Sequence, residues 1–313
     1  MKALALPAID HYVELIDLPL PAVEEGQIRV KVHAASVNGF DLAVSAGYLR
    51  GRMEHHFPVV IGKDFAGIVA AVGDNVTGFR VGDRVFGVVS ESVLGTGSFG
   101  EYVTVAADFG VTLLPDEISF DDGAALGLAG TTARDALNAV TMDESTTVLI
   151  SGATGGVGQQ LLQLAAATGA HVIATAPTPT DVDLLTTLGA SQTVDSSRNI
   201  TEQMGKLHPD GVDVVFHLAG DVDALSALVK STGTFVTTIA LDLPPVLATG
   251  ARAERIMAMA TRTTLDDVAA AHASGLTTLS IAAVYTLDEF QSALAHFTSG
   301  KRGKIVVRPN LEA

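Results

Sequence analysis

The strongest indication of the fold is the segment Val148-Leu-Ile-Ser-Gly-Ala-Thr-Gly-Gly-Val-Gly158. It has the pattern of a buried strand, a glycine-rich turn and the start of a helix, which is how a dinucleotide-binding unit begins. Gly155 and Gly156 let the backbone approach a pyrophosphate without a Cβ atom in the way, and N–H groups at the helix start face the phosphates. Gly158 lets the helix pack closely on the strand. The alternative is a tight turn that holds no ligand. We predict that five turn residues bind a dinucleotide: Ala153, Thr154, Gly155, Gly156 and Val157.

Strands and helices alternate on the C-terminal side of this stretch. We expect strands over 147–151, 171–175, 192–194, 212–218, 233–239 and 255–260, and helices over 158–168, 182–188 and 265–272. Such alternation predicts a doubly wound parallel sheet with helices on both faces.

The rest of the chain has a different texture. About 115 residues at the N-terminus form short strands with glycine turns, which predicts a β-rich, barrel-like unit. The tail over 280–307 returns to strand, helix and strand, so we expect it to rejoin the first unit. The predicted α/β chain therefore has a β-rich domain split into 1–117 and 277–313, and a dinucleotide-binding domain over 118–276.

Composition excludes several classes of protein. The 313 residues include no cysteine, which removes disulfides, thiolate-bound metals and cysteine nucleophiles. A net charge of −16 opposes nucleic-acid binding. The sequence contains no run of 18 uncharged apolar residues, so we predict no membrane span. Asp10 and Glu14 come too early for a signal-peptide core, and we expect a cytoplasmic location.

The residues after the second predicted strand bear on the choice of coenzyme. Folds that select NAD place an acidic residue about 20 positions after the glycines, where it binds the ribose 2′-hydroxyl. Here the segment 174–180 reads Ala-Thr-Ala-Pro-Thr-Pro-Thr, without a carboxylate. Thr175 and Thr178 can instead bind a 2′-phosphate, and Arg198 after the third strand is a possible cationic partner. We predict NADP(H) in preference to NAD(H); the alternative is a solvated threonine loop.

The whole chain resembles the medium-chain dehydrogenase/reductase superfamily, and within it the zinc-independent quinone oxidoreductases of the zeta-crystallin-like branch. The similarity lies in the order and spacing of short segments that match the family: 35–41 (Ala-Ser-Val-Asn-Gly-Phe-Asp), 58–69, 82–87 (Gly-Asp-Arg-Val-Phe-Gly), 97–103, 130–133, 152–158, 211–216 and 303–306 (Gly-Lys-Ile-Val).

The resemblance implies a GroES-like catalytic domain split around a Rossmann domain, with the coenzyme between the two, and it implies a homodimer. Zinc-dependent relatives hold their metal with side chains whose first two positions match Asn38 and Lys63 here. Lysine is a cation at neutral pH and does not ligate zinc. The four-cysteine structural zinc lobe is also missing, so we predict that the protein binds no metal.

The resemblance also assigns residues to the site. Asn38 and Tyr48 match residues near the nicotinamide and the substrate, and they are the predicted catalytic pair; a turn asparagine and a packed tyrosine are the alternatives. Other positions match residues that contact the nicotinamide or its ribose: Thr132, Leu218, Ala219, Ile239, Ala240 and Met259. His217 replaces a residue that is often aspartate in relatives, and we expect it to pack within the sheet.

The predicted function is NADPH-dependent reduction of a quinone or of an activated C=C bond by hydride transfer, with a small apolar carbonyl compound or quinone as substrate. One alternative is reduction of enoyl thioesters in a polyketide- or fatty-acid-type pathway. Another, of a different class, is a nucleotide-binding regulatory or structural protein without activity. Function resides in the site and not in the fold, so the sequence leaves these readings open.

Overall fold

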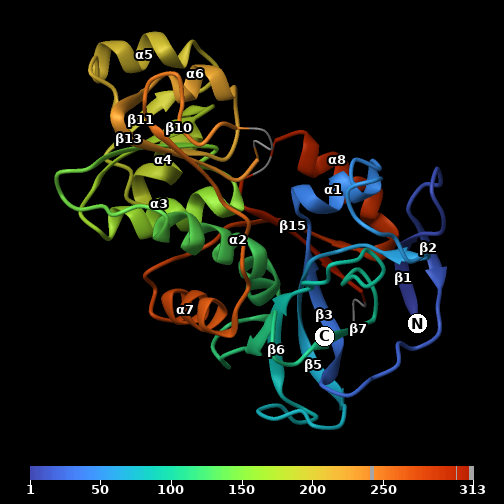
Figure 1. Ribbon diagram of the computed structural model, residues 1–313. Helices are drawn as coiled ribbons and strands as arrows, with labels where there is room; N and C mark the ends of the chain where they lie inside the picture. The colour runs from blue at the N-terminus through green and yellow to red at the C-terminus, as the bar shows by residue number, and fades with distance from the viewer. Residues whose placement is uncertain (240–242, 301, 310–313) are drawn as a thin grey trace. The chain divides into compact units, whose positions relative to one another are not determined.

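The glycine-rich turn follows one strand of a six-stranded parallel sheet (Figure 1). The computed structural model describes residues 1–239, 243–300 and 302–309. Across the sheet the strands are β11 (Gln192–Asp195), β10 (His171–Ala176), β9 (Thr147–Ser151), β12 (Val212–His217), β13 (Val229–Thr237) and β14 (Arg252–Arg255). All five pairings are parallel. In chain order this is 3-2-1-4-5-6, the order of a Rossmann fold, and it confirms the predicted doubly wound sheet.

Helices cover both faces of this sheet because the strand side chains alternate between them. Val148 and Ile150 of β9 pack on the side of α3 (Gly156–Ala166) and α4 (Pro179–Thr187). Leu149 faces the other way, into the apolar cluster that contains residues of α5 (Ile200–Leu207) and α6 (Val222–Ser226). Helices α5 and α6 lie side by side (Figure 1).

The sixth strand lies closer to the N-terminus than the sequence predicted. We expected it over 255–260, but β14 ends at Arg255. Its partner β13 ends at Thr237, which pairs with Arg255, so β13 has no further residue with which β14 could pair. Met257 and Met259 beyond it are exposed, and neither is buried on a face of the sheet.

The first of the two compact units contains 1–128, 260–273 and 279–313, and the second contains 129–259 and 274–278. Helix α2 (Phe120–Asn138) contributes residues to both. The expected boundaries, at 117 and at 276, fall near these limits but do not coincide with them. No helix in the described part of the chain is long and apolar enough to cross a membrane.

The first unit is β-rich. Its larger sheet has the order β15 (Ile281–Thr286), β16 (Lys304–Arg308), β3 (Gln27–Ser36), β5 (Asp64–Val72), β6 (Arg84–Val88) and β8 (Val111–Leu113), with β7 (Tyr102–Ala106) paired to β3. A smaller sheet contains β2 (Glu14–Asp17), β1 (Lys2–Leu6) and β4 (Val59–Val60). The helical elements are α1 (Gly39–Ser45), α7 (Arg262–Ala273), η1 (Leu287–Glu289) and α8 (Phe290–Thr298).

The C-terminal tail joins this larger sheet, as we expected from its strand pattern. Strand β16 pairs antiparallel with β3, so that Val306 lies opposite Ser36 and Val307 opposite Ala35. This pairing brings Lys304 at the start of β16 to the end of β3, where the segment with Asn38 begins. The tail therefore supplies a charged side chain to a site that consists otherwise of N-terminal residues.

Candidate functional site

The glycine-rich turn has the shape that a phosphate group requires. Gly152 has a φ of +80°, which favours glycine, and a Cβ atom at Gly158 would lie 2.3 Å from the carbonyl oxygen of Gly152. A Cβ atom at Gly155 would instead meet only that same oxygen, at 3.5 Å. Gly158 is therefore needed for packing, whereas the space at Gly155 is open to a ligand.

The start of α3 offers unpaired donors beside this open space. The first N–H groups of a helix have no partner within it, and together with the helix dipole they attract anions. The capping residue is Gly155, which has no side chain to bind those groups, and the first turn contains no acidic residue. The turn and the helix start therefore fit the pyrophosphate of a dinucleotide coenzyme.

The two threonines after β10 have different surroundings. Thr175 is buried, and its hydroxyl oxygen accepts a hydrogen bond from the Gly152 N–H group at 3.0 Å, so it fixes the glycine turn from within. Thr178 is exposed and caps α4: its hydroxyl accepts from the N–H group of Asp181 and donates to the carboxylate, at 2.5 Å. Asp181 is buried in this cap. The first carboxylate after β10 is thus committed to the helix start.

Arg198 follows β11, the strand next to β10, and Asp195 pairs with Ala176 across the two strands. The guanidinium group of Arg198 is largely exposed and forms an ion pair with Asp195, in which Nε lies 3.1 Å from Oδ2. Because neighbouring parallel strands end at the same edge of a sheet, Arg198 and Thr178 lie beyond the same edge. This edge holds an exposed cation, Arg198, while the nearby Thr178 hydroxyl is engaged with Asp181.

His217 joins the two loops that follow β12 and β13. Its Nε2 atom lies 3.1 Å from the carbonyl oxygen of Gly220, which only accepts, so Nε2 carries the proton and donates. In the neutral ring Nδ1 then accepts from the hydroxyl of Thr237 at 3.0 Å. That hydroxyl also accepts from the N–H group of Ile239 at 3.3 Å. The ring is buried as expected, and it links the carboxyl ends of both strands.

The residues expected to contact the nicotinamide and its ribose are distributed over these loops and α2. Leu218 is partly buried, while Ala219, Ile239 and Met259 are exposed. Thr132 is buried within α2. The backbone N–H group of Met259 donates to Asp135 at 2.7 Å. Ala240 lies outside the described residues.

In the first unit, Asn38 belongs to a buried cluster of polar groups. Its Nδ2 atom donates to the carbonyl oxygen of Ser36 at 3.1 Å and to Oδ2 of Asp64 at 2.9 Å. Its Oδ1 atom accepts from Nζ of Lys304 at 2.5 Å. Lys304 also lies 3.1 Å from Oδ2 of Asp64, and the Ser36 hydroxyl donates to the same oxygen at 2.6 Å. Both amide protons of Asn38 are therefore engaged within the protein.

Asp41 lies one turn into α1, next to this cluster. Its Oδ2 atom accepts from the backbone N–H group of Asn38 at 2.8 Å, and its Oδ1 atom is buried with no hydrogen-bond partner in the described structure. Burial raises the pKa of Asp41 to about 7, the Asn38 hydrogen bond opposes that rise, and the nearby Asp64 carboxylate adds to it. This acid is thus partly protonated near neutral pH.

Tyr48 lies in the turn after α1, and 75% of the side chain is exposed. Its backbone N–H group donates to the carbonyl oxygen of Ala43, which fixes the turn. Its surroundings differ from those of Asn38: the tyrosine is open to a ligand, while the asparagine is enclosed.

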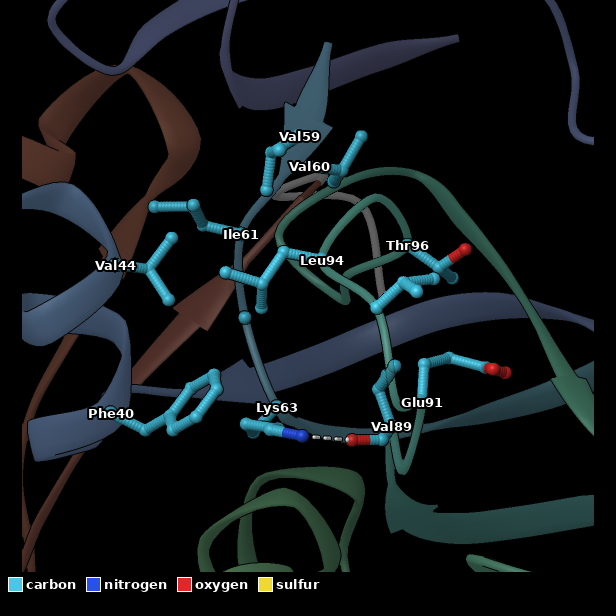
Figure 2. A pocket seen from close by; sticks show the side chains of 12 residues that line it. Phe40, Val44, Val59, Val60, Ile61, Lys63, Val89, Glu91, Leu94 and Thr96 are labelled. Atoms are coloured by element: carbon cyan, nitrogen blue, oxygen red, sulfur yellow. Dashed lines mark hydrogen bonds between the residues drawn. The ribbon is translucent and has the colours of Figure 1, made fainter. Parts of the chain in front are cut away.

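Lys63, which precedes β5, lies in a small pocket of the first unit (Figure 2). Side chains of α1, of β4 and the residue after it, and of the loop after β6 form its apolar walls, among them Phe40, Val44, Ile61 and Leu94. The Lys63 ammonium group donates to the carbonyl oxygen of Val89 at 2.7 Å and lies 4.5 Å from the centre of the Phe40 ring. The described residues contain no group of three or more acidic or histidine side chains that could hold a metal ion.

Sequence reasoning missed the partners of these residues. Asp64 and Lys304 both lie in segments that resemble the family, but they are 240 positions apart, and nothing in either segment indicates that they pair. Asp41 follows Asn38 by three residues, the spacing of a capping box, and this local signal predicts its contact with the Asn38 backbone.

Comparisons with known proteins agree with this geometry. The family model of the alcohol dehydrogenase GroES-like domain matches residues 24–116, and that of zinc-binding dehydrogenases matches residues 156–257. A quinone oxidoreductase of Sus scrofa is 35% identical over 210 residues, which are 66% of this chain and 62% of the relative. An NADPH-dependent alkenal/one oxidoreductase, chloroplastic, of Arabidopsis thaliana is 31% identical over 234 residues, 73% of this chain and 59% of the relative. The match therefore spans about three fifths of the length of these curated relatives.

The fold is also that of a solved protein. The structure of the quinone oxidoreductase from Coxiella burnetii superposes with a TM-score of 0.86 at 26% identity and covers 99% of both chains. The β-rich unit is thus GroES-like and the parallel sheet is Rossmann-like, as predicted. The chain belongs to the medium-chain dehydrogenase/reductase superfamily, and it is similar to the quinone oxidoreductases within it.

Proposed function

We propose that the protein is an NADPH-dependent oxidoreductase that reduces a quinone or an activated C=C bond. The open glycine turn at the start of α3 is the observation that carries this proposal, because it leaves space and free N–H donors for a pyrophosphate. The similarity to a quinone oxidoreductase and to an alkenal/one oxidoreductase supports the substrate class. NADPH supplies the hydride when it is bound.

The preference for NADPH over NADH rests on the edge of the sheet after β10 and β11. Asp181 is engaged in the α4 cap, and Arg198 supplies an exposed cation suited to a 2′-phosphate. Thr178 would donate to that phosphate only by giving up its hydrogen bond to Asp181. The printed name of the Arabidopsis relative supports the same preference. Thr175 acts indirectly, since its hydroxyl holds Gly152.

We assign different roles to the two predicted catalytic residues. Tyr48 is exposed and donates a hydrogen bond to the substrate from its hydroxyl. Asn38 acts by position: its amide fixes Asp64 and Lys304, and its backbone begins α1. Its donation to a substrate carbonyl would require the loss of one of these internal hydrogen bonds.

We also propose that the reaction uses no zinc, since Lys63 occupies the position of a metal-ligating residue in zinc-dependent relatives and a cation does not ligate zinc. The homodimer implied by the resemblance stays a prediction. The outer strands of the six-stranded sheet are β11 and β14, and the outer side of β14 already pairs in part with the segment around Val246. Light scattering on the purified protein tests the dimer, and elemental analysis tests the absence of zinc.

The first experiment is a parallel titration of NADPH and NADH, followed by nucleotide fluorescence and by thermal shift. Tighter binding of NADPH supports the proposal, and equal binding of both contradicts the 2′-phosphate site. An Arg198→Ala variant should bind NADPH more weakly and leave the affinity for NADH unchanged. The control variant Arg80→Ala, in the other unit, should change neither affinity. Binding of neither nucleotide by folded protein overturns the oxidoreductase proposal.

A turnover screen then separates the substrate classes. Quinones, enones and enoyl thioesters are each tested with NADPH. Turnover of quinones or enones supports the proposed function, whereas turnover of enoyl thioesters alone favours the pathway-type reductase, which has less support from the comparisons. Coenzyme binding without turnover of any of them points to a regulatory or structural protein.

A further inference from the structure

The Lys63 pocket combines an apolar wall with one partly buried cationic group. The lining consists mostly of aliphatic and aromatic side chains, and its polar members are Lys63, Glu91 and Thr96. Figure 2 shows the Lys63 ammonium group at one end, bonded to the Val89 carbonyl, and the Phe40 ring beside it. The cavity has a volume of about 20 Å³. That is enough for one water molecule, or for an oxygen atom of a ligand in its place.

Two contacts hold the ammonium group in place without satisfying it. It donates to Val89 and lies over the Phe40 ring, which attracts a cation through its π electrons. An ammonium group has three N–H donors, and no other described residue accepts a hydrogen bond from Lys63 or forms an ion pair with it within 4.0 Å. The remaining donors are therefore available to an acceptor that enters the pocket.

The charges that face Lys63 come from three elements. Asp41 lies on α1, Asp64 begins β5, and Glu91 lies on the loop after β6. Burial lowers the pKa of Lys63 and is the dominant influence, while these three carboxylates oppose the shift. Asp64 is already paired with Lys304, and Asp41 is partly protonated near neutral pH. None of these carboxylates forms an ion pair with Lys63 within 4.0 Å in the described part of the chain, so they favour its charge without engaging its N–H donors.

We propose that Lys63 is a catalytic residue for the substrate oxygen: its ammonium group donates a hydrogen bond to the carbonyl oxygen of a quinone or enone and stabilises the negative charge that this oxygen gains. This inference rests on the proposed function. The β-carbon of the C=C bond accepts a hydride with its electron pair, the π electrons move to the carbonyl oxygen, and the resulting enolate takes a proton from water at its α-carbon or oxygen. Lys63 keeps its own proton, so NADPH, substrate and one proton give NADP⁺ and the reduced product.

A fixed cation in an apolar pocket should stabilise the charged transition state more than it strengthens binding of the neutral substrate. Donors aimed at the place where charge develops stabilise the transition state more than the neutral ground state. Removal of one such donor lowers kcat by about 10²–10³-fold. We therefore expect Lys63→Met to lower kcat much more than it raises KM.

The test compares Lys63→Met, which removes the charge, with Lys63→Arg, which keeps it, and with Lys206→Met, an exposed lysine of α5, as the matched control. Each variant is assayed for thermal unfolding, NADPH affinity, and kcat and KM with an enone. We expect Lys63→Met to lose about 10²–10³-fold in kcat with unchanged NADPH affinity. We expect Lys63→Arg to keep a substantial part of the activity and Lys206→Met to keep all of it.

The pH profile supplies a second measurement. Activity of the natural protein should fall on the alkaline side as Lys63 loses its proton, at a pH below the ordinary lysine value of 10.5, because burial lowers this pKa. The fall should move to higher pH in Lys63→Arg and disappear from the residual activity of Lys63→Met. If Lys63→Met folds poorly, the pH shift of Lys63→Arg decides the matter.

Full activity of Lys63→Met, or an unchanged alkaline fall in Lys63→Arg, overturns the role of Lys63 and leaves the proposed function intact. Failure of the proposed function looks different: the natural protein itself then reduces no quinone or enone with NADPH.

Discussion

Lys304 and Asp64 form a buried ion pair, with Nζ 3.1 Å from Oδ2 and both side chains almost fully enclosed. The pair is well satisfied: Oδ2 of Asp64 also accepts from Ser36 and Asn38, and Oδ1 accepts from the backbone N–H group of Leu128 at 2.7 Å. Removal of one member of a buried pair leaves an uncompensated charge, which costs more than the pair itself contributes.

We therefore expect Lys304→Met to lower the free energy of unfolding by about 3–5 kcal/mol. Asp64→Asn should also destabilise the protein, and the double variant should lose less than the sum of the two. Chemical denaturation of all three gives the coupling energy. Strictly additive losses would show that the two charges do not stabilise each other.

Asp41 makes stability depend on pH. Its folded pKa of about 7 lies above the ordinary value of 3.8, so the unfolded chain releases this proton first as the pH rises. Deprotonation then favours the unfolded state, and the free energy of unfolding falls between about pH 4 and pH 7 and levels off above. The loss at this site is on the order of a few kcal/mol.

Asp41→Asn should flatten this part of the pH profile, while Asp288→Asn, at an exposed site in η1, should leave it unchanged. Thermal unfolding from pH 4 to pH 8 measures the slopes. If the profile of Asp41→Asn matches that of the natural protein, Asp41 does not hold its proton in the folded state.

Gly155 and Gly158 separate coenzyme binding from packing. A Cβ atom at Gly155 has only an ordinary contact at 3.5 Å, so Gly155→Ala should fold normally but bind NADPH more weakly, because its methyl group occupies the approach to the α3 amides. A Cβ atom at Gly158 would overlap the backbone of Gly152 and Ala153, so Gly158→Ala should cost about 1–3 kcal/mol of stability.

Thermal unfolding and NADPH titration of the two glycine variants distinguish these effects. If Gly155→Ala binds NADPH with normal affinity, or loses stability while Gly158→Ala does not, the turn does not hold the phosphates in this way.

His217 should affect both stability and coenzyme affinity. His217→Phe fills the space of the ring but removes its hydrogen bonds with the Gly220 carbonyl and the Thr237 hydroxyl, each worth about 0.5–1.5 kcal/mol. The loops after β12 and β13 then lose their common anchor, and we expect a higher Kd for NADPH. His217→Gln, which keeps a donor and an acceptor, should restore part of the affinity at equal protein stability; an unchanged Kd in His217→Phe would exclude a positioning role.

Asn38 shows how far the sequence goes toward the site. Its resemblance to a family residue indicated a functional neighbourhood, and the spacing to Asp41 indicated a helix start, which α1 has. The resemblance did not indicate that the amide is enclosed by Asp64 and Lys304. Those contacts depend on the pairing of β16 with β3, a relationship between distant parts of the chain.

Elements whose requirements are local could be predicted from the sequence. The strand, turn and helix over 148–158 follow from the positions at which only glycine fits, and the parallel sheet follows from the alternation of strands and helices along the chain. Tertiary structure alone decided where β14 ends, which acid Lys304 neutralises, and that Lys63 is left as a cation in an apolar pocket. The physical reason is that burial and charge pairing depend on which segments meet in space, and short-range sequence patterns do not specify those meetings.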